Sequence, residues 1–185
     1  MTIEMQRRAL HIPVLHIDAN LINARQKLPA VNQLEMWAET GIICINMSST
    51  ARTEARAGSN LNRTRKADEQ IHTLTPPAET NDPDYQHIES AIFPGGAKDK
   101  NQQNDIRIIF EAKKYAAILV TTDGGSKTQP GGILGNRDKL KNMLKVLSPD
   151  EAVDFVRSKI QERDNFNMRV VKEFGGEVPE WTGSD

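Results

Sequence analysis

Residues 116–123 read AAILVTTD, a short apolar run rich in β-branched side chains that ends at Asp123. A run of this length without polar alternation is typical of a strand buried on both faces of a parallel sheet. Two earlier runs, at 12–17 and 42–47, are of the same kind, and the first is followed by Asp18. We therefore expect three buried strands, with a last short strand at 144–147.

Helical patterns lie between these strands. An apolar stripe predicts a helix over 29–40, which Gly41 ends. Three more helices are predicted from their caps and apolar faces: one that carries Glu54, one at 105–115 with Asn104 as its cap, and one at 149–163 behind the capping box that begins at Ser148. Strands that alternate with helices predict an α/β fold of three layers, with a mainly parallel central sheet flanked by helices.

The predicted elements fill one domain over residues 12–163, which a chain of 185 residues allows. Prolines and glycines interrupt residues 58–100, where apolar residues are sparse. We interpret this stretch as an insertion or long loop, apart from a short helix around Tyr85. Residues 164–185 show no clear element, and we expect a C-terminal tail with a frayed end.

Composition excludes several classes of protein. Lys and Arg number 24 and Asp and Glu 25, a net charge of −1, which excludes a globally basic nucleic-acid wrapper. The one cysteine, Cys44, excludes an internal disulfide and a cysteine-rich zinc site. No apolar run approaches the roughly 20 residues that a membrane span needs, and the first ten residues do not read as a secretory signal. We therefore expect a cytoplasmic protein that does not engage a membrane.

Four carboxylates from separate segments are placed near one edge of the predicted sheet. Asp18 and Asp123 end two strands, Glu54 lies about one helical turn beyond the second strand, and Asp105 begins the helix that leads into the third. Ligands of parallel sheets bind outside the carboxyl ends of the strands. An all-oxygen cluster suits Mg²⁺ or Mn²⁺, which activate water and stabilise phosphoryl displacement. The alternative, left open for each acid, is a structural role as a turn or cap residue.

These residues lie in motifs that resemble, in order, the four motifs of the PIN-domain nucleases. The motifs are IDAN at 17–20, TE at 53–54, ND at 104–105 and LVTTD at 119–123, and VLSPDEA at 146–152 is similar to the last strand and helix of that family. The long stretch at 58–100 departs from the family pattern.

The resemblance implies a catalytic, metal-binding cluster of Asp18, Glu54, Asp105 and Asp123, with Mg²⁺ or Mn²⁺ as cofactor. It makes Asn20 and either Thr121 or Thr122 supporting polar groups. The implied activity is cleavage of single-stranded RNA, often as the toxin of a toxin–antitoxin pair. The expected partners are single-stranded RNA, an inhibitory protein and a second copy of the chain in a homodimer.

Basic residues flank the proposed cluster on both sides. Residues 51–66 hold five basic residues against one acid, and 123–145 hold five against two, whereas 78–105 hold six acids against two lysines. Such patches bind phosphate backbones, although they are also common as solvated faces. The predicted nucleic-acid-binding residues are Arg52, Arg56, Arg63, Lys127, Arg137 and Lys139.

The leading hypothesis is a metal-dependent endoribonuclease. One rival is a phosphatase with Asp18 as nucleophile, but that chemistry usually needs a second aspartate where Asn20 stands. Another rival is a non-catalytic PIN-like scaffold that binds RNA or protein. His16, two residues before Asp18, is interpreted as a buried histidine with satisfied hydrogen bonds and not as a catalytic group.

Overall fold

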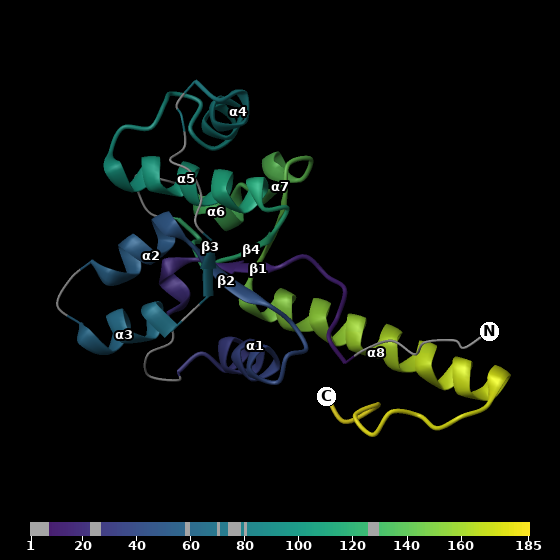
Figure 1. Cartoon of the computed structure of the whole chain (residues 1–185). Coiled ribbons are helices and arrows are strands. Elements are labelled where there is room, and N and C mark those ends of the chain that lie inside the picture. The colour runs from purple at the N-terminus through teal and green to yellow at the C-terminus, as the bar shows by residue number, and fades with distance from the viewer. Residues whose placement is uncertain are drawn as a thin grey trace.

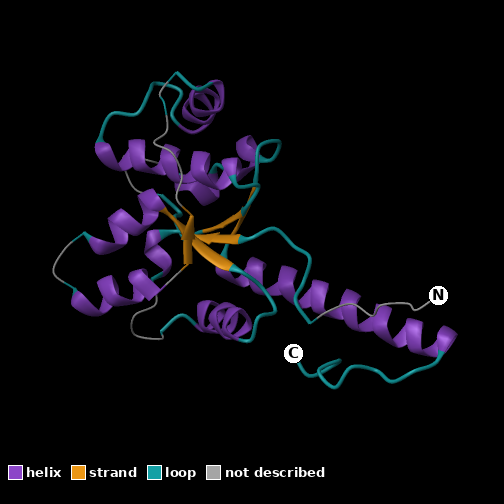
Figure 2. Cartoon of the chain, viewed as in Figure 1, coloured by secondary structure: helices purple, strands orange, loops and turns teal. Residues whose placement is uncertain are grey.

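The structure is a computed structural model of the chain, and it describes residues 8–22, 27–57, 60–69, 71–73, 79, 81–125 and 130–185. The described residues form a parallel sheet whose strands run in the order β3-β2-β1-β4-β5. The strands are β1 (Leu15–Ile17), β2 (Ile45–Ser48), β3 (Ile71–Thr73), β4 (Ile118–Val120) and β5 (Lys145–Leu147). All four pairings are parallel, which confirms the predicted α/β class (Figure 2).

Helices cover both faces of the sheet and make the three layers that the sequence predicts. On one side, α1 (Pro29–Glu39) packs against α8 (Pro149–Phe174) and β2, and α8 also contacts β5. On the other side, α5 (Lys100–Lys114) contacts β2 and β4. Figure 1 shows these two groups of helices above and below the sheet. Burial of β1 and β4 along their whole length explains the continuous apolar runs in which they lie.

The order of the strands changes direction at β1, which has β2 on one side and β4 on the other. Where the strand order of a parallel sheet reverses, the connections from the two neighbouring strands run to opposite faces of the sheet. They leave a crevice between them at the carboxyl ends of the strands. The 3₁₀ turn η1 (Ala19–Leu21) lies there, directly after Asp18, and it contacts α2 (Ser49–Arg56). The topology therefore places Asp18 at the position where this class of fold binds ligands.

The described part of residues 58–100 is not a long loop, so that expectation was wrong, while the expectation of an insertion stays a prediction. They contain α3 (Leu61–Glu69), β3 and α4 (Pro83–Ile92), of which only α4 was foreseen. Pro83 begins α4 as its first residue and Asp82 caps it, with its side chain accepting from the Asp84 backbone N–H at 2.9 Å. Proline disrupts the interior of a strand or a helix, but it is favourable at the first position of a helix. Pro83 was therefore misread as a break, whereas Pro76 and Pro77 lie outside the described residues.

The C-terminal segment is also ordered, contrary to prediction. Helix α8 continues past Arg163 to Phe174, and the following residues fold back along it. The Trp181 ring lies 4.3 Å from the Arg163 guanidinium, and the Asp185 carboxylate binds both Arg163 and Arg8. Asn167 and Val170 are buried in this part of α8, beyond the predicted end of the helix.

The start of α5 was misplaced by five residues. Asp99 is its cap, accepting from the Gln102 backbone N–H at 2.9 Å, so Asn104 and Asp105 lie in the second turn. The glycine-rich stretch after Asp123 contains two short helices, α6 (Gly132–Gly135) and α7 (Arg137–Leu140). In the part of the chain that the structure describes, no helix combines the length and apolar character that crossing a membrane requires.

Candidate functional site

Asp18 is the centre of the candidate site. It follows β1 and is 6% exposed, and the Thr121 hydroxyl donates to its Oδ2 at 2.7 Å. Burial raises the pKa of Asp18 to about 6, and the charges of Glu54 and Asp123 act in the same direction, against the Thr121 hydrogen bond. Three of the four predicted carboxylates therefore interact electrostatically at this edge.

Thr121 connects the polar groups around Asp18. Its hydroxyl accepts from the Asp123 backbone N–H at 2.9 Å and from the Asn20 side-chain amide at 3.3 Å. Thr122 is exposed, and only its backbone N–H reaches Asn20, at 3.5 Å. Of the two candidate supporting threonines, Thr121 is therefore the one that contacts the carboxylates.

Asp123 is held by the loop that follows it. Its carboxylate accepts from the backbone N–H groups of Gly125 at 3.0 Å and Ile133 at 2.7 Å. Gly132 has φ +51°, and a Cβ at this position would lie 2.5 Å from both carboxylate oxygens. Only glycine lets the loop close on Asp123. The turn role considered for this aspartate is thus real, while its oxygens keep lone pairs for a further ligand.

Glu54 projects from α2, whose start is capped by Ser48, with the Ser48 side chain accepting from the Ala51 backbone N–H. The Asn104 amide of α5 donates to Glu54 Oε1 at 2.5 Å. Asp105 is half-buried in the same turn of α5. Asn104 was predicted as a helix cap, so its contact with Glu54 was not foreseen. The cap at Asp99 would have been the signal that Asn104 lies inside the helix.

The donor set at this edge suits a hard cation, because it consists of carboxylate, amide and hydroxyl oxygens. Within the described residues, however, no three His, Cys, Asp or Glu side chains are grouped closely enough to hold a metal ion. The residue types at this edge are those that Mg²⁺ or Mn²⁺ prefers, but the described side chains are not gathered closely enough to enclose one ion.

Most of the predicted nucleic-acid-binding residues are engaged with protein groups. Arg52 and Arg56 pair with Asp68, at 2.9 and 3.6 Å, and Arg137 pairs with Glu151 at 2.6 Å. Lys139 donates to the Asn136 side chain at 2.7 Å. Arg63 donates to the Ala19 carbonyl at 2.9 Å, beside Asp18. Lys127 lies outside the described residues.

A pocket of about 700 Å³ opens between α2 and α5, next to the carboxylates. Glu54 and Asn104 belong to its lining, together with Thr53, Lys100 and Arg107. Neither Lys100 nor Arg107 was predicted as a functional residue, because Lys100 lies in an acidic stretch of sequence and Arg107 lies on a helix whose start was misplaced. This pocket extends the site away from Asp18 along α5.

Comparison with models of protein families and with curated proteins finds no match to this chain.

Proposed function

We propose that this protein is a metal-dependent endoribonuclease that hydrolyses phosphodiester bonds of single-stranded RNA. Asp18, Glu54 and Asp123 would hold Mg²⁺ or Mn²⁺, and Asp105 is the fourth candidate ligand. When bound, such an ion activates water and stabilises the charge that develops on the phosphate. The resemblance of the four acidic motifs to PIN-domain nucleases supports the same function.

One observation carries this proposal: Asp18 is a buried carboxylate that two neighbouring carboxylates destabilise further. Among the described residues no basic side chain forms an ion pair with it. A buried charge without a partner is costly, and it persists mainly where a cation or a proton balances it. Clustered acids with a raised pKa in a crevice are typical of functional sites.

The surrounding residues have positioning roles in this proposal. Thr121 fixes one oxygen of Asp18. Asn104 holds one oxygen of Glu54 at 2.5 Å, which limits the rotation of that long side chain. The backbone amides of Gly125 and Ile133 hold Asp123. Preorganised ligands lose less entropy when an ion binds.

The test is cleavage of a labelled single-stranded RNA by the purified protein, with Mn²⁺ or with a chelator. We expect cleavage only with the metal, and we expect Asp18→Asn and Asp123→Asn to lower the rate at least about 100-fold, as loss of a central catalytic electrostatic group does. Asp154→Asn is the matched control, because Asp154 is exposed on α8 and far along the chain from the site. Equal cleavage in chelator, or normal cleavage by Asp123→Asn, would contradict the proposal.

A non-catalytic RNA-binding scaffold is the second candidate, and one observation favours it. Both oxygens of Asp123 are already bonded to backbone amides, and the described carboxylates do not form a group of three. The same experiment separates the candidates, because a scaffold would bind the RNA and leave it intact with either metal or chelator.

A further inference from the structure

Several of the cations that the sequence suggests are neutralised by acids, although Arg63 does lie beside Asp18, on the Ala19 carbonyl. Arg52 and Arg56 are neutralised by Asp68, and Arg137 by Glu151. On α5, the two C-terminal lysines are also paired: Lys113 with Asp84, and Lys114 with Asp82. Lys100 has no acidic partner among the described residues, and it lines the pocket beside Glu54.

Arg107 lies two helical turns after Lys100, so both side chains stand on the same side of α5 and both line the pocket. Arg107 also acts electrostatically on Tyr85 of α4, whose pKa burial raises. Seven residues of helix separate the two positions by about 10 Å. This spacing suits contacts to two different phosphates of a strand better than a shared contact to one.

We infer that the pocket between α2 and α5 is a phosphate-binding subsite for single-stranded RNA, with Lys100 and Arg107 as its cations. This inference rests on the proposed function for the identity of the ligand. Asn104 lies between Lys100 and Arg107 on α5 and donates to Glu54, so a phosphate held by either cation would lie next to this carboxylate. A volume of about 700 Å³ falls in the range of sites that take a small ligand.

Glu111 is the remaining charge in this pocket, and it does not oppose the assignment. It is 4% exposed, and Thr50 donates to it through its hydroxyl at 2.7 Å and its backbone N–H at 3.2 Å. These bonds compensate its charge at the base of α2. The accessible charges that a strand would meet along α5 are therefore Lys100 and Arg107.

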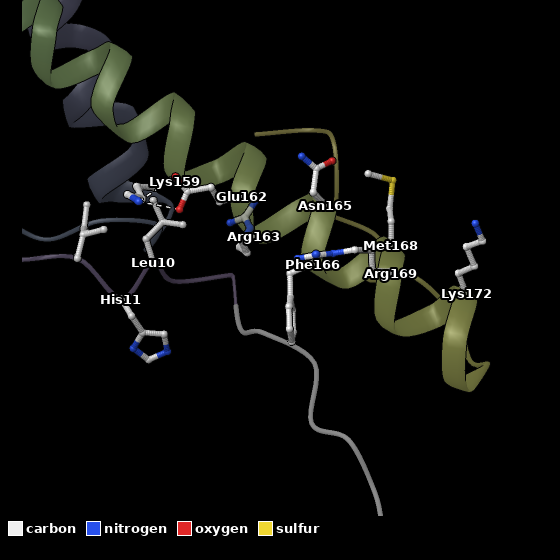
Figure 3. A pocket seen from close by; sticks show the side chains of 11 residues that line it. Leu10, His11, Lys159, Glu162, Arg163, Asn165, Phe166, Met168, Arg169 and Lys172 are labelled. Carbon is white, nitrogen blue, oxygen red and sulfur yellow. Dashed lines mark hydrogen bonds and ion pairs between the residues drawn. The ribbon is translucent and has the colours of Figure 1, made fainter.

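A second cationic pocket, of about 850 Å³, provides the internal comparison. It lies between residues 10–12, which precede β1, and the distal half of α8, and Figure 3 shows its lining side chains. Lys159 is paired there with Glu162, but Arg169 and Lys172 have no ion pair among the described residues. Because this pocket is at the opposite end of β1 from Asp18, a strand held there would not reach the carboxylates directly.

The test is binding of a short fluorescent single-stranded oligoribonucleotide in the presence of chelator, measured by anisotropy at several salt concentrations. We expect Lys100→Gln and Arg107→Gln each to raise Kd about 3- to 10-fold and to reduce the slope of log K against log salt by about 0.7. Arg107→Lys, which keeps the charge, should restore most of the affinity. Lys172→Gln removes one exposed charge from the other pocket and should leave Kd unchanged.

The inference is overturned if Lys100→Gln and Arg107→Gln bind as the unchanged protein does, if Lys172→Gln weakens binding as much, or if the unchanged protein binds no RNA. Cleavage with Mn²⁺ is recorded separately on the same samples. RNA binding that depends on Lys100 and Arg107 without cleavage supports the subsite and contradicts the nuclease. Cleavage by a protein whose RNA binding does not depend on Lys100 and Arg107 supports the nuclease and contradicts the subsite.

Discussion

His16 is buried in the central strand without the hydrogen bonds that a histidine normally finds. Its side chain is 1% exposed, and neither ring nitrogen has a partner among the described residues. Its ring lies 5.8 Å from that of Tyr115. Burial lowers the pKa of His16 to about 4, against the opposing charge of Glu111. The expectation of a buried histidine is confirmed, and the expectation of satisfied nitrogens is wrong.

This histidine makes the fold sensitive to acid. The unfolded chain, with an ordinary histidine pKa near 6.5, takes up the proton before the folded chain does, so stability present above pH 6.5 is lost as the pH falls toward 4. We predict that His16→Leu reduces the loss of unfolding free energy between pH 6.5 and 4.5 by about 2 kcal/mol. Urea unfolding of both proteins at pH 6.5 and at pH 4.5 measures this difference in unfolding free energy.

The control for this prediction is His87→Leu, which removes an exposed histidine from α4. It should leave the pH dependence of unfolding as it is in the unchanged protein. If His16→Leu and His87→Leu show the same dependence, the buried imidazole is not the acid-sensitive group.

At the scale of elements, the sequence predicts best where a single pattern spans a whole element. The stripe on α1 and the capping box of α8 are such patterns, and Glu151 indeed bonds back to the Ser148 backbone N–H at 2.8 Å. Strand β3 was missed because its sequence, Ile-His-Thr, does not lie in a longer apolar run as β1 and β4 do. The far end of α8 was missed because Arg163 and Asn167 are polar, so the sequence pattern does not show that they are buried.

Arg163 joins α8 to the last residues through a buried ionic cluster. Its side chain is 1% exposed, and its guanidinium binds Asp164, Asp185 and the Arg8 carbonyl. Asp164 in turn accepts from the Gly183 backbone N–H at 2.8 Å. Burial of a guanidinium is strongly destabilising unless carboxylates balance its charge, as Asp164 and Asp185 do here.

We predict that Asp185→Ala destabilises the fold by about 2–3 kcal/mol, because it removes one of two carboxylates from a buried arginine. For a chain of this size, the melting temperature should fall by roughly 4–12 °C. Glu162→Ala breaks an exposed pair with Lys159 and should change stability by less than about 1 kcal/mol. Equal melting temperatures for the two variants would show that the cluster does not hold the segment.

At the scale of the whole molecule, the parallel topology gathers chemistry from distant parts of the chain. The convergence of Asp18, Glu54 and Asp123 could be predicted, because the carboxyl ends of parallel strands meet at one edge. The Asn104–Glu54 contact and the pairing of Arg52 with Asp68 could not, because each joins two helices whose packing no local pattern encodes. The carboxylates are therefore the part of the site that the sequence predicts.

The charge on Asp18 links this site to stability. Its pKa in the folded protein, about 6, exceeds the ordinary value of 3.8, so the folded chain keeps its proton to higher pH. The unfolding free energy of the metal-free protein therefore falls as the pH rises from about 4 to 6, in the opposite direction to the effect of His16. Asp18→Asn removes this cost while its amide oxygen still accepts from Thr121.

The most direct measurement is the melting temperature of the unchanged protein, Asp18→Asn and the control Asp154→Asn at pH 7, with and without saturating Mn²⁺. An ion at a hundredfold excess over Kd adds about 2.7 kcal/mol, or roughly 5–10 °C for this chain. We predict that rise for the unchanged protein and for the control. We predict that Asp18→Asn has a higher melting temperature than the unchanged protein without metal, and that Mn²⁺ changes it little. No response of the unchanged protein to Mn²⁺, together with an Asp18→Asn variant that is neutral or less stable, would contradict a metal site built on Asp18.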